Sequence, residues 1–157
     1  MANVMIAGPN RIDAATLLGG AWETENPLEN LQTRDYGEAA ISVDRSPAST
    51  TIIIDHGESV ENRVVALLFS PPVRRTRAQF MPAHPLTADA LWRVSRGTTP
   101  GGAEDDTTGW LDCWQTEYTR ERRADPVVVL PAGVSARYTT IEIDDETTTL
   151  SFLRLPR

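Results

Sequence analysis

The sequence predicts an all-β fold, built as an antiparallel sandwich or barrel. About eight short segments have the patterns of strands at short spacing, and no segment has the pattern of a long helix. Residues 51–54 and 64–69 are apolar runs, which indicates strands that are buried on both faces. At 157 residues the chain is long enough to bury one substantial core.

The first third of the chain has weak periodicity. Residues 13–18 predict one helical turn that is capped by Asp13 and ended by a pair of glycines. In residues 39–44, Ile41 and Val43 alternate with polar residues, which is typical of a half-buried strand with these two side chains facing inward. We expect a loop between these two segments.

The centre of the chain holds the clearest strands. Residues 55–58 are expected to be a loop that joins the two apolar runs. A pair of prolines ends the second run, and residues 73–80 are expected to continue as an edge strand. Residues 90–96 alternate again, with either Ala90, Trp92 and Val94 or Leu91 and its neighbours facing inward.

The last third predicts a surface loop and then more strands. The loop spans residues 98–108, and residues 110–118 fit both a helix and a strand, with the glycine ahead of them favouring a strand. Residues 127–130 form another buried run. Residues 138–144 and 148–155 are expected to form a hairpin, in which the two isoleucines of the first strand share one face.

The composition limits the classes of function. The 22 acidic residues outnumber the 15 basic residues, and the net charge of −7 disfavours nucleic acid and anionic membranes as partners. All of the bases are arginine, a side chain suited to protein–protein contacts, although codon bias in a GC-rich genome is the simpler explanation. No apolar run is long enough to insert into a membrane, and the first eight residues do not resemble a signal peptide, so we expect a soluble product.

Candidate chemical groups are few. The single cysteine, Cys113, excludes an internal disulfide and a cysteine-cluster metal site, and its apolar surroundings predict a buried thiol. His56 and His84 lie in turn-like contexts without a nucleophile motif, so we expect structural or solvent-exposed roles and no catalytic residue. Trp92 and Trp110 are expected in the core.

Five short pieces of sequence occur in a characteristic order. They are Asn-Pro-Leu-Glu-Asn-Leu at 26–31, Ile-Ile-Ile-Asp-His-Gly at 52–57, Trp-Arg-Val at 92–94, Asp-Thr-Thr-Gly-Trp-Leu-Asp-Cys-Trp at 106–114, and Ala-Arg-Tyr at 136–138 followed by Ile-Glu-Ile-Asp-Asp at 141–145. Together they resemble the galactose-binding-like (discoidin-type) jelly rolls of tailed-bacteriophage virions, in tail or tail-tip proteins. The chain departs from that pattern at residues 69–72, where prolines replace a more usual asparagine-bearing exit.

This resemblance implies an antiparallel jelly-roll β-sandwich of about eight strands. We expect residues 1–21 to be an N-terminal arm or short helical lead-in, and residues 22–157 to form a single β-sandwich domain. The resemblance also implies that no cofactor is needed, with a structural calcium ion near residues 26–35 as an option. Acidic runs at 104–106 and 144–146 lack the spacing of a calcium loop, so solvated turns are the simpler interpretation.

The leading functional hypothesis is a non-enzymatic structural virion protein, associated with the tail or baseplate and assembled in the host cytoplasm. Its partners would be other virion proteins and copies of itself, through two arginine clusters at residues 74–77 and 120–123. A capsid decoration or head-spike protein is a close alternative. The alternative from another class is a carbohydrate-binding module that adheres to host-surface glycans, with Arg96, Trp114 and Tyr118 as candidate contacts. A hydrolase that uses one of the histidines is the third hypothesis.

Overall fold

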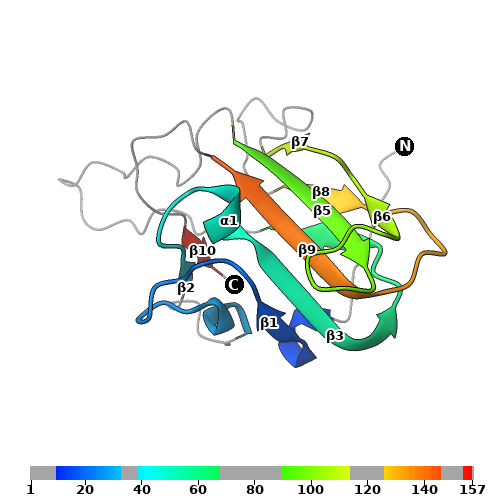
Figure 1. Ribbon diagram of the computed structural model, residues 1–157, viewed down its shortest axis with the longest axis horizontal. Helices are drawn as coiled ribbons and strands as arrows, with labels where there is room; N and C mark the ends of the chain where they lie inside the picture. Colours follow the sequence, from blue (N-terminus) through cyan, green and yellow to red (C-terminus); the bar gives the residue numbers. More distant parts are fainter. Residues whose placement is uncertain (1–9, 33–38, 68–89, 114–125, 146–153, 157) are drawn as a thin grey trace, which may run out of the picture.

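The larger layer of the molecule is a six-stranded antiparallel sheet (Figure 1). The computed structural model describes residues 10–32, 39–67, 90–113, 126–145 and 154–156. Along the sheet the strands are β1 (Thr16–Leu18), β3 (Ile52–Val60), β9 (Ala136–Asp144), β5 (Leu91–Gly97) and β6 (Asp106–Thr107), and β7 (Leu111–Asp112) also pairs with β5. The pairs β3–β9 and β5–β9 place strands from distant parts of the sequence at the centre.

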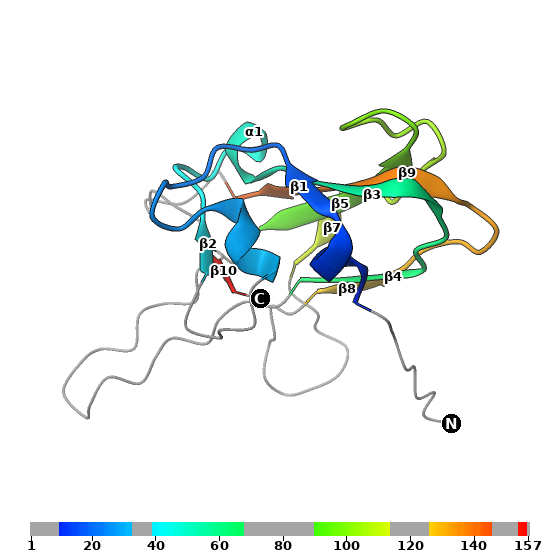
Figure 2. The ribbon, with the colours of Figure 1, turned by 90° about the horizontal axis from the view of Figure 1, so that it is seen from below.

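Two short strand pairs lie against one side of this sheet (Figure 2). They are β4 (Val64–Ala66) with β8 (Val127–Val129), and β2 (Ala39–Ile41) with β10 (Arg154–Pro156). Among the residues that the structure describes, helical structure is limited to η1 (Arg11–Ala14), η2 (Leu28–Gln32) and α1 (Pro47–Thr50). The predicted antiparallel jelly-roll sandwich is confirmed. In the described part of the chain, no helix has the length and apolar character needed to span a bilayer.

The core lies between the two layers. Trp92 and Val94 face into it, which settles the open alternative for β5, and the predicted burial of Trp92 and Cys113 is confirmed. Ile141 and Ile143 share the inner face of β9, as predicted. The remaining core side chains come from both layers and from the N-terminal third: Leu17, Leu28, Leu31, Ala40, Ile52, Ile54, Val65, Leu67, Ala90 and Leu130.

The predicted loop at residues 55–58 is wrong, because β3 runs continuously from Ile52 to Val60. The polar residues lie within β3, where the pairing with β9 shifts register between Asp55 and Val60. Gly57 adopts a left-handed conformation in this stretch (φ 75°). The two apolar runs also lie in different layers, since β3 pairs with β9 and β4 pairs with β8. Only one face of the first run is fully buried, because Ile53 is half-exposed on the outer face of the sheet.

The helical turn predicted for residues 13–18 is also wrong in extent. A 3₁₀ turn ends at Ala14 and is capped by Asn10, and Thr16–Leu18 forms β1 instead. A strand is favoured here because Leu17 reaches the core while its two neighbours stay exposed. The division into an arm of residues 1–21 and a domain of residues 22–157 stays a prediction, although β1 of that arm pairs with β3.

Three further expectations need correction. The inward face of residues 39–44 carries Ala40 and Ser42, whereas Val43 is exposed. The hairpin is wrong because β9 pairs with β3 on one edge and β5 on the other. Of its second predicted strand, residues 148–153 lie outside the described residues, and β10 at its end pairs with β2. In the run at 127–130, only Leu130 is fully buried. The edge strand predicted at residues 73–80 and both arginine clusters lie outside the described residues.

Candidate functional site

An exposed tryptophan lies on the outer face of the large sheet, beside β5. Arg93 points outward because its neighbours Trp92 and Val94 point into the core, and Glu142 is its direct partner on β9. Trp110 immediately precedes β7, which pairs with the start of β5. We call Trp110, Arg93 and Glu142 the tryptophan platform.

The three side chains of the tryptophan platform hold one another in place. The Arg93 Cζ atom lies 4.7 Å from the centroid of the Trp110 ring, within the range of a cation–π contact. Arg93 also forms a two-pronged pair with Glu142, in which Nη2 donates to Oε1 at 2.8 Å and Nε donates to Oε2. This hydrogen bonding raises the pKa of the Arg93 guanidinium. The platform is therefore a connected row across two strands and the edge of the sheet.

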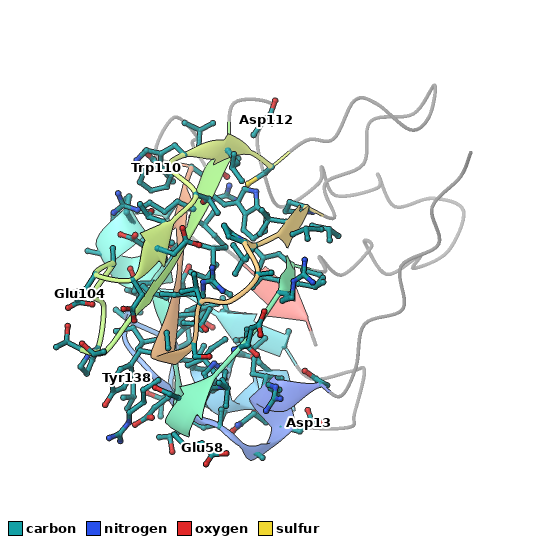
Figure 3. The ribbon with its side chains drawn as sticks, turned by 90° about the vertical axis from the view of Figure 1, so that its right-hand side faces the viewer. Asp13, Glu58, Glu104, Trp110, Asp112 and Tyr138 are labelled. Carbon is teal, nitrogen blue, oxygen red and sulfur yellow. The ribbon has the colours of Figure 1, made fainter. Side chains whose placement is uncertain are left out.

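The tryptophan platform is open to solvent. Trp110 is 40% exposed, and the side chains of Arg93 and Glu142 are 36% and 19% exposed. The predicted burial of Trp110 in the core is therefore wrong. Figure 3 shows Trp110 on the same side of the large sheet as Glu104 and Tyr138. An accessible ring beside a guanidinium and a carboxylate can stack against an apolar surface and form hydrogen bonds at its rim.

The loop of residues 98–105 covers the neighbouring part of this face (Figure 2). A Cβ atom built on Gly101 would lie 3.8 Å from Cδ1 of Ile53, so the loop packs directly on the sheet. Glu104 fixes the loop by accepting hydrogen bonds from the Thr99 hydroxyl and nearby backbone N–H groups, which lower the pKa of its carboxyl. Thr140, on the same outer face, is only 2% exposed. The loop leaves the tryptophan platform uncovered.

Arg96, predicted as a ligand contact, is instead buried in the sandwich, with 1% of its side chain exposed. Its Nη2 donates to Asp106 at 2.6 Å and to the Pro131 carbonyl at 3.3 Å. Its Nη1 donates to the carbonyls of Asn62 and Val134 at 3.0 and 3.2 Å. The predicted role as a ligand contact is wrong, because Arg96 faces inward with Trp92 and Val94. Its guanidinium instead holds the connections between strands together through hydrogen bonds.

His56 is half-buried among polar side chains at the same end of the sheet. Its Nε2 lies 2.7 Å from Nδ2 of Asn62 and 3.1 Å from Oγ1 of Thr139. Burial lowers the pKa of His56, and the positive charge of Arg11 lowers it further. This cluster supplies neutral hydrogen bonds that hold the loop after β3 against β9. His56 therefore has hydrogen-bond partners that suit a structural role.

The other predicted site residues lie outside the described part of the chain: Trp114, Tyr118 and His84. Among the described residues, no group of three or more His, Cys, Asp or Glu side chains is placed to hold a metal ion. Within the acidic runs, Asp106 pairs with Arg96 and Asp145 pairs with Arg45. Part of the segment at 26–35 that the resemblance linked to calcium is also outside the described residues.

Part of the tryptophan platform can be predicted from the sequence. Arg93 lies between two core residues of one strand and Glu142 between two of another, so alternation alone predicts that both face outward. The register that pairs them cannot be obtained from that pattern. Trp110 was assigned to the core because its size and apolar character are those of a core residue, and alternation within 110–118 did not fix its face.

Solved structures with the same fold include two carbohydrate-binding domains. One is described as "CBM32 of AlyQ in complex with 4,5-unsaturated mannuronic acid", with a TM-score of 0.55 and 12% identity over 90% of this chain and 89% of the other. The other, a mutant of the lectin-binding domain of Lectinolysin complexed with Lewis b, has a TM-score of 0.58 and 15% identity over 96% and 94%. No protein-family model and no curated protein matches the chain. The fold is therefore galactose-binding-like.

Proposed function

We propose that this protein is a non-catalytic carbohydrate-binding module that binds glycans at the tryptophan platform. The observation that carries the proposal is the exposed Trp110 ring, held by the Arg93–Glu142 pair on the outer face of the large sheet. The two carbohydrate-bound neighbours support it at the level of the fold. These neighbours support carbohydrate binding better than a purely structural virion role.

The chemistry of a sugar ring fits these three side chains. One face of a pyranose ring presents C–H groups that pack against an aromatic surface, while its rim presents hydroxyls that donate and accept hydrogen bonds. Trp110 supplies the aromatic surface. Arg93 supplies donors and Glu142 supplies acceptors beside it. The three groups are fixed before binding, which lowers the entropy cost of ordering them around a ligand.

Glycan binding with a Trp110→Ala variant tests this proposal. We expect the wild-type protein to bind members of a glycan panel and the variant to lose at least about tenfold in affinity, which corresponds to about 1.4 kcal/mol. Leu18→Ala is the matched control, since Leu18 is 41% exposed on the outer face of β1 in the same sheet. It should bind like the wild type, and circular dichroism should show both variants folded. A panel in which the folded wild type binds nothing would contradict the proposal.

We also propose that the module belongs to the virion of a tailed phage or phage-like particle. The support is the ordered sequence resemblance, from the segment at 26–31 to the segment at 141–145. In this setting the protein would assemble with other virion proteins and copies of itself, in the tail, baseplate or head, and would attach the particle to host glycans. Mass spectrometry of purified particles tests this second proposal, and absence of the protein from every particle fraction would contradict it.

A further inference from the structure

We propose that the tryptophan platform selects uncharged sugars and discriminates against sugars that carry a carboxylate. This inference rests on the proposed glycan binding and adds the class of ligand. It follows from the way the charges of Arg93 and Glu142 are arranged around Trp110. Neither the fold nor an exposed aromatic ring requires this selectivity, because aromatic stacking is available to neutral and acidic sugars alike.

The positive charge of the platform is already compensated. Both Nε and Nη2 of Arg93 donate to the Glu142 carboxylate, so the guanidinium is already ion-paired with a side chain of the protein. A sugar carboxylate would have to compete with Glu142 for the guanidinium fork, which suits one carboxylate at a time. The net charge of −7 adds a weak, long-range repulsion of anions. The platform therefore offers an acidic sugar no uncompensated cation.

The Glu142 carboxylate also acts directly against an anionic ligand. A carboxylate accepts hydrogen bonds from hydroxyls and repels a second carboxylate placed beside it. Each of its two oxygens receives one hydrogen bond from Arg93 and keeps further acceptor capacity. Among the described residues, Arg93 Nη1 has no hydrogen-bond partner. The platform thus presents free N–H donors on Arg93 and acceptor capacity on Glu142 side by side, which matches neighbouring hydroxyls of a neutral sugar.

Matched pairs of oligosaccharides provide the test. Galacto-oligosaccharides and oligogalacturonates of equal length, linkage position and anomeric configuration share ring stereochemistry and differ at C6, where one has a hydroxymethyl group and the other a carboxylate. Manno-oligosaccharides with oligomannuronates, and gluco-oligosaccharides with oligoglucuronates, extend the comparison to other rings. Titration calorimetry on the wild-type protein should show that the neutral member of a bound pair binds at least about tenfold more tightly, with an affinity that changes less than about twofold between 50 and 500 mM salt.

Glu142→Gln separates this selectivity from a general structural role. Glutamine keeps the size and one acceptor of Glu142 but removes its charge, which leaves Arg93 uncompensated. We expect the variant to bind the acidic member of a pair at least about fivefold more tightly than the wild type does, with an affinity that now falls as salt rises. A merely structural role for Glu142 would weaken binding of both members. Leu18→Ala serves again as the folded control.

The outcomes separate the two proposals. Binding that depends on Trp110 but favours the acidic member of each pair would overturn the selectivity and leave glycan binding standing. Equal affinities within each pair, or a Glu142→Gln variant that gains nothing for the acidic member, would also overturn it. Failure of the wild type to bind any member of any pair, neutral or acidic, would overturn both proposals.

Discussion

Arg96 is a buried cation that joins separate segments of the sandwich. Through four hydrogen bonds it links Asp106 to the carbonyls of Asn62, Pro131 and Val134. These acceptors lie on two connections between strands and on β6. A buried guanidinium is costly to desolvate, and here four hydrogen bonds from Nη1 and Nη2 offset that cost, while the buried Nε has no hydrogen-bond partner among the described residues. Its role is to fix the loops at this end of the molecule.

Replacing Arg96 should therefore destabilise the protein strongly. We expect Arg96→Met to lose about 3–5 kcal/mol in the free energy of unfolding, because it leaves the Asp106 charge and three carbonyls without their donor. Urea denaturation measures this loss. Arg137→Met is the matched control, since Arg137 also forms a two-pronged pair with an aspartate, Asp55, but is 47% exposed, and its loss should be much smaller. Similar losses for the two variants would contradict the structural role of Arg96.

Cys113 should be inert in the native protein. Its side chain is fully buried, and desolvation raises the pKa of its thiol to about 12, with nearby aspartates contributing. Because the thiolate is the reactive form, we expect iodoacetamide at pH 8 to modify the protein only after denaturant unfolds it. Intact-mass measurement follows the modification, and Cys113→Ala gives the background. Rapid modification under native conditions would show that the thiol is accessible.

The burial of individual residues was predictable only where the local pattern was unambiguous. Cys113 and Trp92 lie among apolar neighbours, and both are buried as expected. Trp110 has the same apolar character, yet it is exposed because it precedes β7 at the edge of the sheet, next to Arg93. Arg96 looked like a surface residue because of its charge. Its burial depends on acceptors from distant segments, which no local pattern contains.

At the scale of elements, β3 is the centre of the architecture. It pairs with β1 on one side and β9 on the other, and it continues through Gly57 to reach Val60. The polar stretch around Gly57 was assigned to a loop because glycine and charged residues are typical of turns. A strand is possible there because this end of β3 is exposed and does not need apolar side chains. Strand existence was therefore predictable, whereas strand length and pairing were not.

Glycines with the same backbone conformation should differ in their tolerance of substitution. Gly20 and Gly57 both have positive φ, but a Cβ atom on Gly20 would lie 2.6 Å from the carbonyls of Ser49 and Thr51, while nothing lies within 4 Å of one on Gly57. We expect Gly57→Ala to cost about 1–2 kcal/mol, the usual cost of the left-handed conformation. Gly20→Ala should cost clearly more. Thermal unfolding of the two variants measures this difference, and equal losses would contradict it.

For the whole molecule, the class of fold was predictable and the arrangement of its layers was not. Short strands with turn signals indicate an antiparallel sandwich, and the sandwich is present. The pairing of β2 with β10 and of β4 with β8 depends on which edges meet after the chain folds. That information is distributed over the entire sequence. The expected hairpin failed for this reason, since proximity in sequence was taken as proximity in the sheet.

The stability of the folded protein should depend on pH through His56, which is half-buried among polar side chains. The pKa of His56 is lowered in the folded state, so the unfolded state binds more protons as the pH falls below about 6.5. Stability should therefore be full above that value and decrease as the pH falls toward the lower, folded pKa. Urea midpoints at pH 7.5 and 5.0 measure the effect. His56→Asn should reduce the difference between the two midpoints, and an unchanged difference would contradict this role for His56.

The pairing of distant strands has a consequence for the rate of folding. Ile52 pairs with Ile141, and Ile41 pairs with Arg154, so central and peripheral ladders both join the first half of the chain to its last residues. Closing such long loops costs entropy before any contact compensates for it, and proteins dominated by these contacts fold in about milliseconds to seconds. A ribosome-bound chain cannot complete the large sheet until β9 has emerged. Until then the edge of β3 that later pairs with β9 is open to incorrect pairing.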